Sequence, residues 1–251
     1  MSLGQVTVKR EAGVSEIEFM HPQGNSFPSA LLKHLKEIIL EEDAWDQTKV
    51  ILLRSSGDRA FCAGASFDEL LSIQDKVDGK EFFMGFARLI NTIIRIETPV
   101  IGMVQGKAVG GGVGLAASFD YCHASLNASV KLSELNIGIG PFVIAPVVAH
   151  KVGASGLQSL TWDPNSWKSA QWGYEKGLYH ALHEDLETLE RSARDHAAYL
   201  ASLSSEALKT FKKASWTDTD HWPNLMEERA EMSGSLVLGP EAKTFLEKFK
   251  K

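Results

Sequence analysis

The stretch that decides the fold is PVIGMVQGKAVGGGVGLAASFD, residues 99–120. Its apolar start, residues 99–104, predicts a buried strand, and the glycines after it precede an Ala/Leu-rich helix. On its N-terminal side, strands are predicted over residues 5–9, 15–20 and 50–53, and helices over residues 28–42 and 81–96. Strands separated by helices indicate βαβ-type units and an α/β core.

The last third of the chain has a different pattern. From about residue 182 helical periodicity dominates, without a strand pattern, and predicts helices over residues 186–203, 224–237 and 240–251. We predict an α/β core over residues 1–194 and a helical region over residues 195–251. The helical region is equally compatible with a subunit interface and with a cover on the core.

Composition excludes several classes of protein. The 251 residues carry 26 basic and 32 acidic side chains, a net charge of −6 with no long basic run, so nucleic acid is not an expected partner. The two cysteines, Cys62 and Cys122, have no CxxC spacing, and the eight histidines have no metal-ligand spacing, which predicts neither a disulfide framework nor a metal site. The N-terminus lacks an apolar signal core, and no window predicts a membrane span. We therefore expect a cytoplasmic protein without a membrane partner.

The glycine-rich stretch has two interpretations. Glycines between a strand and a helix allow close approach of a ligand and leave N–H groups free at the helix N-terminus. Gly112, Gly114 and Ala117 fit the loose GxGxx[GA] pattern of a dinucleotide-binding loop, but that pattern alone is weak. A tight turn without any ligand is the other interpretation.

A second stretch, DRAFCAGASFDELLSI (residues 58–73), also presents backbone at the mouth of a helix. Ala63, Gly64 and Ala65 are small, and Ser66 is a candidate cap with Glu69 as its capping-box partner. Two sets of N–H groups that converge from two such loops are the parts of an oxyanion hole. Such a hole stabilises negative charge that develops on a carbonyl oxygen.

A third stretch, SVKLSELNIGIGPFVIAPVVAHKVG (residues 129–153), contains a lone carboxylate, Glu134, among apolar residues. Burial there would raise the pKa of the carboxyl group toward neutrality, as a general acid or base requires. The alternative is a surface glutamate on a loop.

The three stretches, in this order and spacing, resemble the crotonase superfamily, also called the enoyl-CoA hydratase/isomerase family. The motifs are FCAGASF (residues 61–67), VQGKAVGGGVGLA with SFD (residues 104–116 and 118–120) and SELNIGIGP (residues 133–141). HP and NSF in residues 21–27 and AKTFLEKFK at residues 242–250 resemble the family's N-terminal loop and closing helix.

The resemblance implies an α/β spiral of ββα units with a C-terminal helical trimerisation region, and a homotrimer or homohexamer. It implies an acyl-CoA thioester substrate, with coenzyme A as part of the substrate and no separate cofactor. By position, the oxyanion N–H groups belong to Ala65 and Gly111, and Glu134 is the catalytic carboxylate. The substrate-binding residues that it implies are Pro22, Arg59, Phe61, Ala63, Ser66, Phe67, Gly110, Gly114, Ser133, Pro141 and Phe142.

One departure from the family pattern bears on the reaction. Efficient hydratases of the family use two glutamates, and here the first position is Gly114 whereas the second is kept as Glu134. A single carboxylate favours proton shuttling between two carbons, as in a double-bond isomerase. The alternatives are a hydratase in which Asp68 or Glu69 supplies the second acid, a decarboxylase, a reaction on a carrier-protein thioester, and a non-catalytic acyl-CoA-binding subunit. Phe142 follows the third motif's proline and is expected to narrow the acyl pocket near Glu134.

Overall fold

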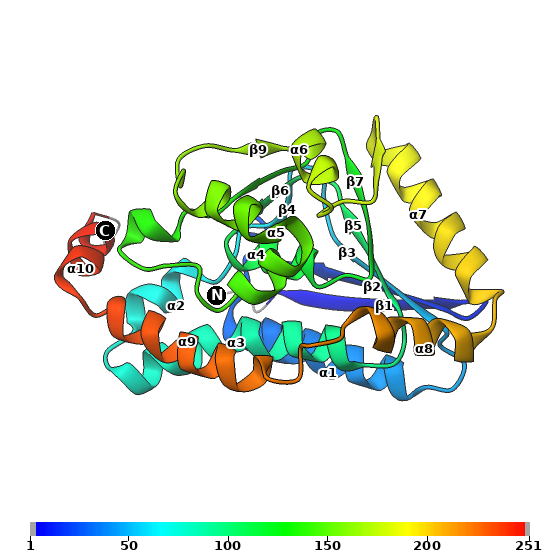
Figure 1. The fold of residues 1–251 in the computed structure, drawn as a ribbon, viewed down its shortest axis with the longest axis horizontal. Coiled ribbons are helices and arrows are strands. Elements are labelled where there is room, and N and C mark those ends of the chain that lie inside the picture. Colours follow the sequence, from blue (N-terminus) through cyan, green and yellow to red (C-terminus); the bar gives the residue numbers. More distant parts are fainter. Residues whose placement is uncertain (1–3, 249–251) are drawn as a thin grey trace.

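The structure, a computed structural model, describes residues 4–248 and is built on two sheets (Figure 1). The larger sheet has the order β1-β2-β3-β5-β7-β10, with one antiparallel pair, β1 and β2, and parallel pairing beyond it. Its strands are β1 (Gln5–Glu11), β2 (Val14–Met20), β3 (Val50–Ser55), β5 (Val100–Val104), β7 (Tyr121–Ser125) and β10 (Ala181–His183). The smaller sheet is β4 (Ala60–Cys62), β6 (Lys107–Val109), β8 (Ser129–Lys131) and β9 (Lys168–Ser169).

Helices cover both faces of the larger sheet. The main core includes buried residues of α1 (Ser29–Ala44), α3 (Lys76–Arg95), α4 (Gly111–Ala117) and α5 (Ala145–Thr161). A second core lies under α7 (Leu186–Ala201). Every residue of β3 and β5 is therefore buried, which explains the apolar sequences of β5 and of residues 50–53 in β3. Arg54 and Ser55, which end β3, are buried polar residues. The α/β prediction is confirmed.

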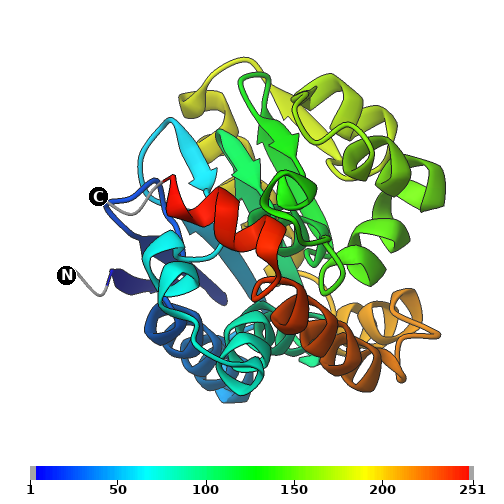
Figure 2. The same cartoon turned by 90° about the vertical axis from the view of Figure 1, so that its left-hand side faces the viewer.

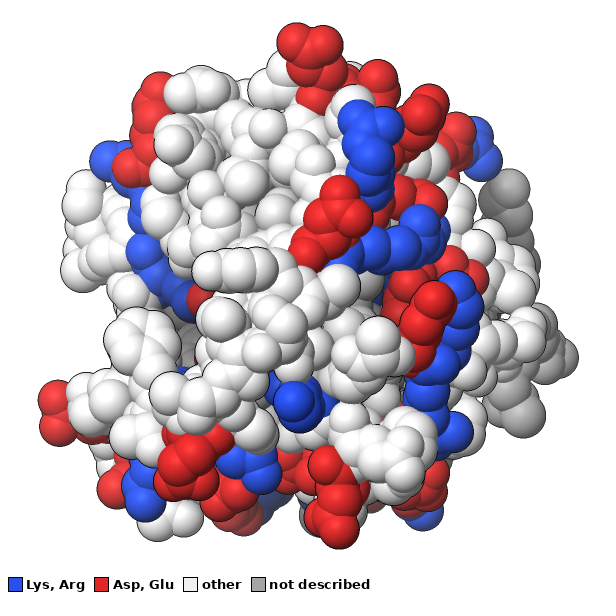
Figure 3. Space-filling view, turned by 90° about the vertical axis from the view of Figure 1, so that its right-hand side faces the viewer, with Lys and Arg blue, Asp and Glu red and all other residues white. Residues whose placement is uncertain are grey.

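Helix α7 packs on one face of the larger sheet. Its buried face, which includes Leu189 and Ala197, packs on Leu52 and Ile101 of the sheet. Ion pairs join Arg194 of α7 to Glu16 of β2, and Figure 3 shows a belt of mixed charge beside a broad uncharged area on the side of the molecule where α7 lies. The domain boundary predicted at residue 194 falls inside this helix, between residues that pack on the same sheet.

Helix α8 (Ser205–Ser215) is attached to the sheet by a buried ion pair. Lys212, only 3% exposed, pairs with Asp120 at 2.9 Å and donates to the carbonyl oxygens of Ile93 and Thr98. Asp120 also accepts from the Trp216 indole (2.7 Å) and from the backbone N–H of Val100 (2.7 Å). The aspartate at the end of the glycine-rich motif thus organises packing, away from the site described below.

Helix α9 (Trp222–Leu236) packs along α3, and α10 (Pro240–Glu247) crosses one end of the molecule. Figure 2 shows α10 in red across this end, near α2 (Phe67–Ser72). It contacts the 3-10 helix η1 (Glu134–Ile137): a Cβ atom at Gly138 would lie 3.0 Å from the Ala242 nitrogen. The C-terminal helices therefore cover the end of the core where η1 lies.

The structure changes several element boundaries. Helix α3 begins at Lys76, five residues before the predicted start, because Asp75 caps it by accepting from the N–H groups of Val77 and Asp78. The region expected to lack strands contains most of β10. The three residues of this strand are too few to show the alternation of polar and apolar residues that predicts a strand. The last predicted helix, residues 240–251, ends at Glu247, and residues 249–251 lie outside the described part of the chain. Helix α6 (Ala170–Glu175) completes the fold. Within residues 4–248 no helix combines the length and the apolar character needed to cross a bilayer.

Candidate active site

The first loop of the site joins β4 to α2. Gly64 has φ of +93°, a backbone conformation that favours glycine. The N–H of Phe27 donates to the Gly64 carbonyl (2.8 Å), and the N–H of Ser66 donates to the Phe27 carbonyl (2.9 Å). The Ala65 N–H lies between these two bonds and takes part in neither. Because successive N–H groups of extended backbone point in opposite directions, the Ala65 N–H faces away from Phe27.

The second loop joins β6 to α4 and lies against the first. Gly111 is the first residue of α4, where N–H groups have no partner within the helix. A Cβ atom at Gly64 would lie 3.0 Å from the Val109 carbonyl oxygen and 3.8 Å from the Gly111 nitrogen. The two loops are thus in contact, and the N–H groups of Ala65 and Gly111 belong to one small region of the cavity wall.

Glu134 stands beside this region at the start of η1. A Cβ atom at Gly110 would lie 2.9 Å from Oε1 of Glu134, so only glycine leaves the carboxyl group its place. Oε2 of Glu134 is buried and has no hydrogen-bond partner, although the residue as a whole is partly exposed. Burial of the carboxyl group raises its pKa from 4.5 to about 7, and the backbone N–H groups of Glu134 and Ser133 partly oppose this rise. The interpretation of Glu134 as an ordinary surface residue is therefore excluded.

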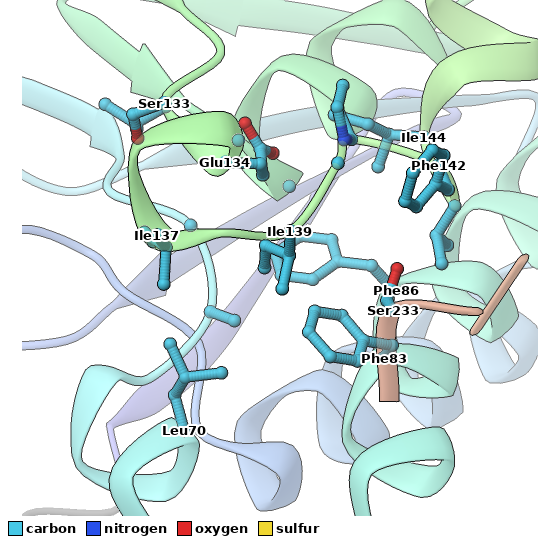
Figure 4. A pocket seen from close by; sticks show the side chains of 18 of the residues that line it. Leu70, Phe83, Phe86, Ser133, Glu134, Ile137, Ile139, Phe142, Ile144 and Ser233 are labelled. Atoms are coloured by element: carbon cyan, nitrogen blue, oxygen red, sulfur yellow. The ribbon is translucent and has the colours of Figure 1, made fainter. Parts of the chain in front are cut away.

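These groups open into a cavity of about 600 Å³, which we call the first cavity. Figure 4 shows its apolar side chains, with the Glu134 carboxyl group among them. Of the described residues that line it, Glu134 alone is ionisable. A proton-transfer group in an apolar enclosure beside two backbone donors is suited to reactions through an enolate.

Most of the predicted site residues line the first cavity. They are Ala63, Ala65, Phe67, Gly110, Gly111, Ser133, Glu134, Pro141 and Phe142.

Pro22 and Arg59 line a second cavity of about 720 Å³, together with His21 and Lys107. The Ala63 N–H, in the wall of the first cavity, donates to the carbonyl of Gly24, in the wall of the second (3.1 Å). The walls of the two cavities are therefore joined directly.

Three predicted residues lie outside the lining of both cavities. Phe61 is fully buried and packs against Phe19 and Phe119. Ser66 caps α2 by accepting from the N–H of Glu69 (3.3 Å). Gly114 faces Ile144 inside the fold.

The two acids considered as replacements at position 114 are also outside the first cavity. Glu69 accepts from the backbone N–H and the hydroxyl of Ser29 at the start of α1 (2.9 and 2.6 Å). Asp68 accepts from the Gln23 side chain (3.3 Å). Both carboxylates therefore serve local structure at the surface.

Sequence reasoning missed much of the cavity wall. Phe82, Phe83 and Phe86 fall in the helix predicted over residues 81–96, but no motif assigns them to the site. The motifs also gave no signal for residues in the C-terminal helices. The lining residues that were missed include Leu70, Phe82, Phe83, Phe86, Ile139, Val143, Ile144, Asn165, Ser233 and Phe245.

The fold and the site define a class: an α/β protein with two backbone N–H groups and one buried carboxyl group around an apolar cavity. A sequence model of the enoyl-CoA hydratase/isomerase family matches residues 9–247. The chain belongs to this family of acyl-CoA enzymes.

Individual relatives agree with this assignment. The chain is 27% identical over 216 residues to a short-chain-enoyl-CoA hydratase of Clostridium acetobutylicum. The aligned region covers 85% of this chain and 82% of that protein. It is 30% identical over 205 residues to the mitochondrial enoyl-CoA hydratase domain-containing protein 3 of Rattus norvegicus. This aligned region covers 79% of the present chain and 65% of the rat protein. The solved structure of an enoyl-CoA hydratase from Bacillus halodurans has the same fold, with a TM-score of 0.89, 18% identity, and 97% and 99% of the two chains covered.

Proposed function

We propose that this chain is an acyl-CoA double-bond isomerase in which Glu134 alone moves the proton. One observation carries the proposal: Glu134 is the one ionisable group among the described residues of the first cavity, and Ile144 occupies the space beside Gly114. Addition of water needs a second group to orient the water or to protonate the product, whereas proton transfer between two carbons needs only one.

The proposed reaction converts a 3-enoyl-CoA to a 2-enoyl-CoA. The thioester oxygen accepts hydrogen bonds from the N–H groups of Ala65 and Gly111. Glu134, as carboxylate, removes a proton from C2, and the electron pair of that C–H bond passes through the conjugated system to the thioester oxygen as a dienolate. The protonated Glu134 then returns a proton to C4, and the double bond ends between C2 and C3. With a pKa of about 7, the carboxyl group of Glu134 can both accept the proton from C2 and return a proton to C4 near neutral pH.

We propose further that the second cavity receives the nucleotide part of coenzyme A. Arg59 and Lys107 supply positive charge there, as phosphate groups require. Because the Ala63 N–H donates to the Gly24 carbonyl, the walls of the two cavities are adjacent, and the thioester arm has a short distance to cover between them. We also propose that the protein forms a homotrimer or a homohexamer, as the family resemblance implies. Light scattering of the purified protein would measure this oligomeric state.

Hydration is the second candidate, since the Clostridium acetobutylicum relative is named as a hydratase. Hydration lacks a second acid among the described residues of the first cavity, because Asp68 and Glu69 are engaged elsewhere. A hydratase mechanism would have to use Glu134 for both roles.

The deciding experiment is incubation of the purified protein with 3-enoyl-CoA esters of graded chain length in deuterated water, followed by mass spectrometry. The proposal predicts a 2-enoyl-CoA of unchanged elemental composition that carries deuterium, and loss of this product in Glu134→Gln. A product heavier by one water would establish hydration instead. Binding without turnover at every chain length would shift the function to a decarboxylase, a carrier-bound substrate or an acyl-CoA-binding subunit.

A further inference from the structure

Ser233 lines the first cavity, and its hydroxyl group has no hydrogen-bond partner. Ser233 lies in α9, is 1% exposed, and its Oγ atom makes no hydrogen bond. Among the described residues that line this cavity, the side-chain atoms buried without a partner are this Oγ and Oε2 of Glu134. Since the carboxyl group of Glu134 is the proposed proton-transfer group, the second unpartnered oxygen also requires an explanation.

A hydroxyl group in the middle of a helix either points to solvent or bonds to the carbonyl one turn earlier. Thr161 and Thr244 of this chain do the latter, with Oγ1 donating to the carbonyls of Leu157 and Pro240 at 2.8 Å. Ser233 does not, although its helix is regular. An unpartnered hydroxyl among apolar groups is unfavourable unless something else supplies the hydrogen bond.

The position of Ser233 is fixed by the packing of α9 on α3. A Cβ atom at Gly79 of α3 would lie 2.8 Å from the Cα atom of Gly234, so the two backbones touch beside Ser233. Lys80 is paired with Glu227 and Glu231 of α9 at 2.7 and 2.6 Å. The hydroxyl is therefore held in place by rigid elements.

The surroundings of Ser233 are apolar. Figure 4 shows its hydroxyl oxygen near the rings of Phe83 and Phe86, away from the Glu134 carboxyl group. No described lysine, arginine or histidine lines the cavity. A carboxylate on the acyl chain would thus have no cation to pair with, whereas a neutral oxygen would need only one hydrogen bond.

We propose that Ser233 recognises a neutral oxygen on the acyl chain, a hydroxyl or keto group remote from the thioester. This rests on the proposed function and narrows it: the substrate is an oxygenated acyl-CoA, not a plain alkyl or a dicarboxylic one. The Ser233 hydroxyl donates to a keto oxygen, or donates to or accepts from a hydroxyl group.

The test measures binding of saturated CoA esters by calorimetry, because these esters cannot isomerise and their affinity is independent of turnover. A plain acyl-CoA is compared with hydroxy and oxo derivatives of the same length, with the oxygen moved one carbon at a time. The wild type is expected to prefer one oxygenated ester by about tenfold, the size of one net hydrogen bond. Ser233→Ala is expected to bind the two kinds of ester within about twofold of each other.

Ser215→Ala is the matched control. Its hydroxyl donates to the Lys212 carbonyl (2.8 Å) at the end of α8, outside the first cavity, so the preference should persist. Equal binding of plain and oxygenated esters by the wild type, or a preference that survives in Ser233→Ala, would overturn the inference and leave the proposed function standing. Failure of every CoA ester to bind would overturn both.

Discussion

Ile144 fills the space beside Gly114: a Cβ atom at Gly114 would lie 2.5 Å from Cγ2 of Ile144 and 2.8 Å from its Cβ atom. The missing second carboxylate of the glycine-rich motif is therefore more than a sequence difference. The packing of α4 against the segment before α5 leaves no room for any side chain at position 114. Among the described residues that line the first cavity, Glu134 therefore supplies the one carboxyl group.

This relationship predicts the behaviour of a restored carboxylate. Gly114→Glu should destabilise the fold by more than about 2 kcal/mol, because the new side chain collides with Ile144 in a packed interior. The double variant Gly114→Glu/Ile144→Ala should recover part of this stability and produce 3-hydroxyacyl-CoA from a 2-enoyl-CoA. Thermal unfolding and product analysis measure the two effects. Equal stability of the single and double variants would show that Ile144 is not the obstacle.

Glu134→Gln should lower kcat by about 10²–10⁴-fold, because the amide cannot accept or return a proton. Affinity for a saturated acyl-CoA should change little, since the N–H groups of Ala65 and Gly111 remain. Single-turnover kinetics and calorimetry separate the two quantities. A variant that keeps more than a tenth of the wild-type kcat would remove Glu134 from the mechanism.

The raised pKa of the Glu134 carboxyl group, about 7, predicts that a rise in pH increases activity and decreases stability. The base must be ionised, so kcat/KM should rise with pH up to an apparent pKa near 7. Because this pKa lies above the ordinary 4.5, the native state holds the proton more tightly than the unfolded state, and its stability should fall between pH 4.5 and about 7.

The same linkage predicts a stabilised variant. Glu134→Gln should be more stable than wild type at pH 8, by on the order of 3 kcal/mol, and nearly equal at pH 4, where both carry a neutral side chain. Denaturant unfolding at the two pH values measures the difference, and a difference that does not depend on pH would contradict a raised pKa.

Gly110→Ala should impair catalysis through Glu134. The added Cβ atom would lie 2.9 Å from Oε1, in a backbone with φ of +53°. Gly153→Ala is the control: its φ is +72°, and nothing lies within 4 Å of its Cβ position. Both variants should lose about 1–3 kcal/mol of stability from backbone strain, but only Gly110→Ala should lower kcat and shift the apparent pKa of the pH profile. Equal kcat in the two variants would contradict the contact.

The buried ion pair of α8 predicts a purely structural loss. Lys212→Met should destabilise the protein by about 3–5 kcal/mol, because Asp120 then lies next to the sheet without its cation. The double variant Asp120→Asn/Lys212→Met should be less destabilised than Lys212→Met alone. Urea unfolding measures both, and kcat of the folded fraction should stay at the wild-type value because neither residue lines the first cavity.

Local sequence was sufficient to locate the elements to which the proposed chemistry is assigned. The loop at Ala63–Ala65, the glycines at 110–111 and the carboxylate at 134 follow from short motifs, because strand-to-helix turns depend on neighbouring residues. The loops were predicted to converge, and they do. Helix α3 begins five residues before the predicted start at residue 81, because the Asp75 side chain caps the earlier turn.

Other site features depend on distant packing. Ser66 and Gly114 belong to the motifs, yet neither lines the cavity, since a motif does not say which way a side chain points. Ile144, Phe83 and Ser233 do line it, and no periodicity in their own segments distinguishes them from ordinary core or interface residues.

The sequence by itself determined the α/β core and the family, and it predicted the positions of the two proposed N–H donors and of Glu134, because backbone turns and their glycines are encoded locally. Only the tertiary structure decided how much room and what polarity surround them. The closure of position 114 by Ile144, the raised pKa of Glu134 and the unpartnered hydroxyl of Ser233 arise where α3, α5, α9 and η1 meet. Burial and contact between such elements are properties of the packed chain, and no single segment contains them.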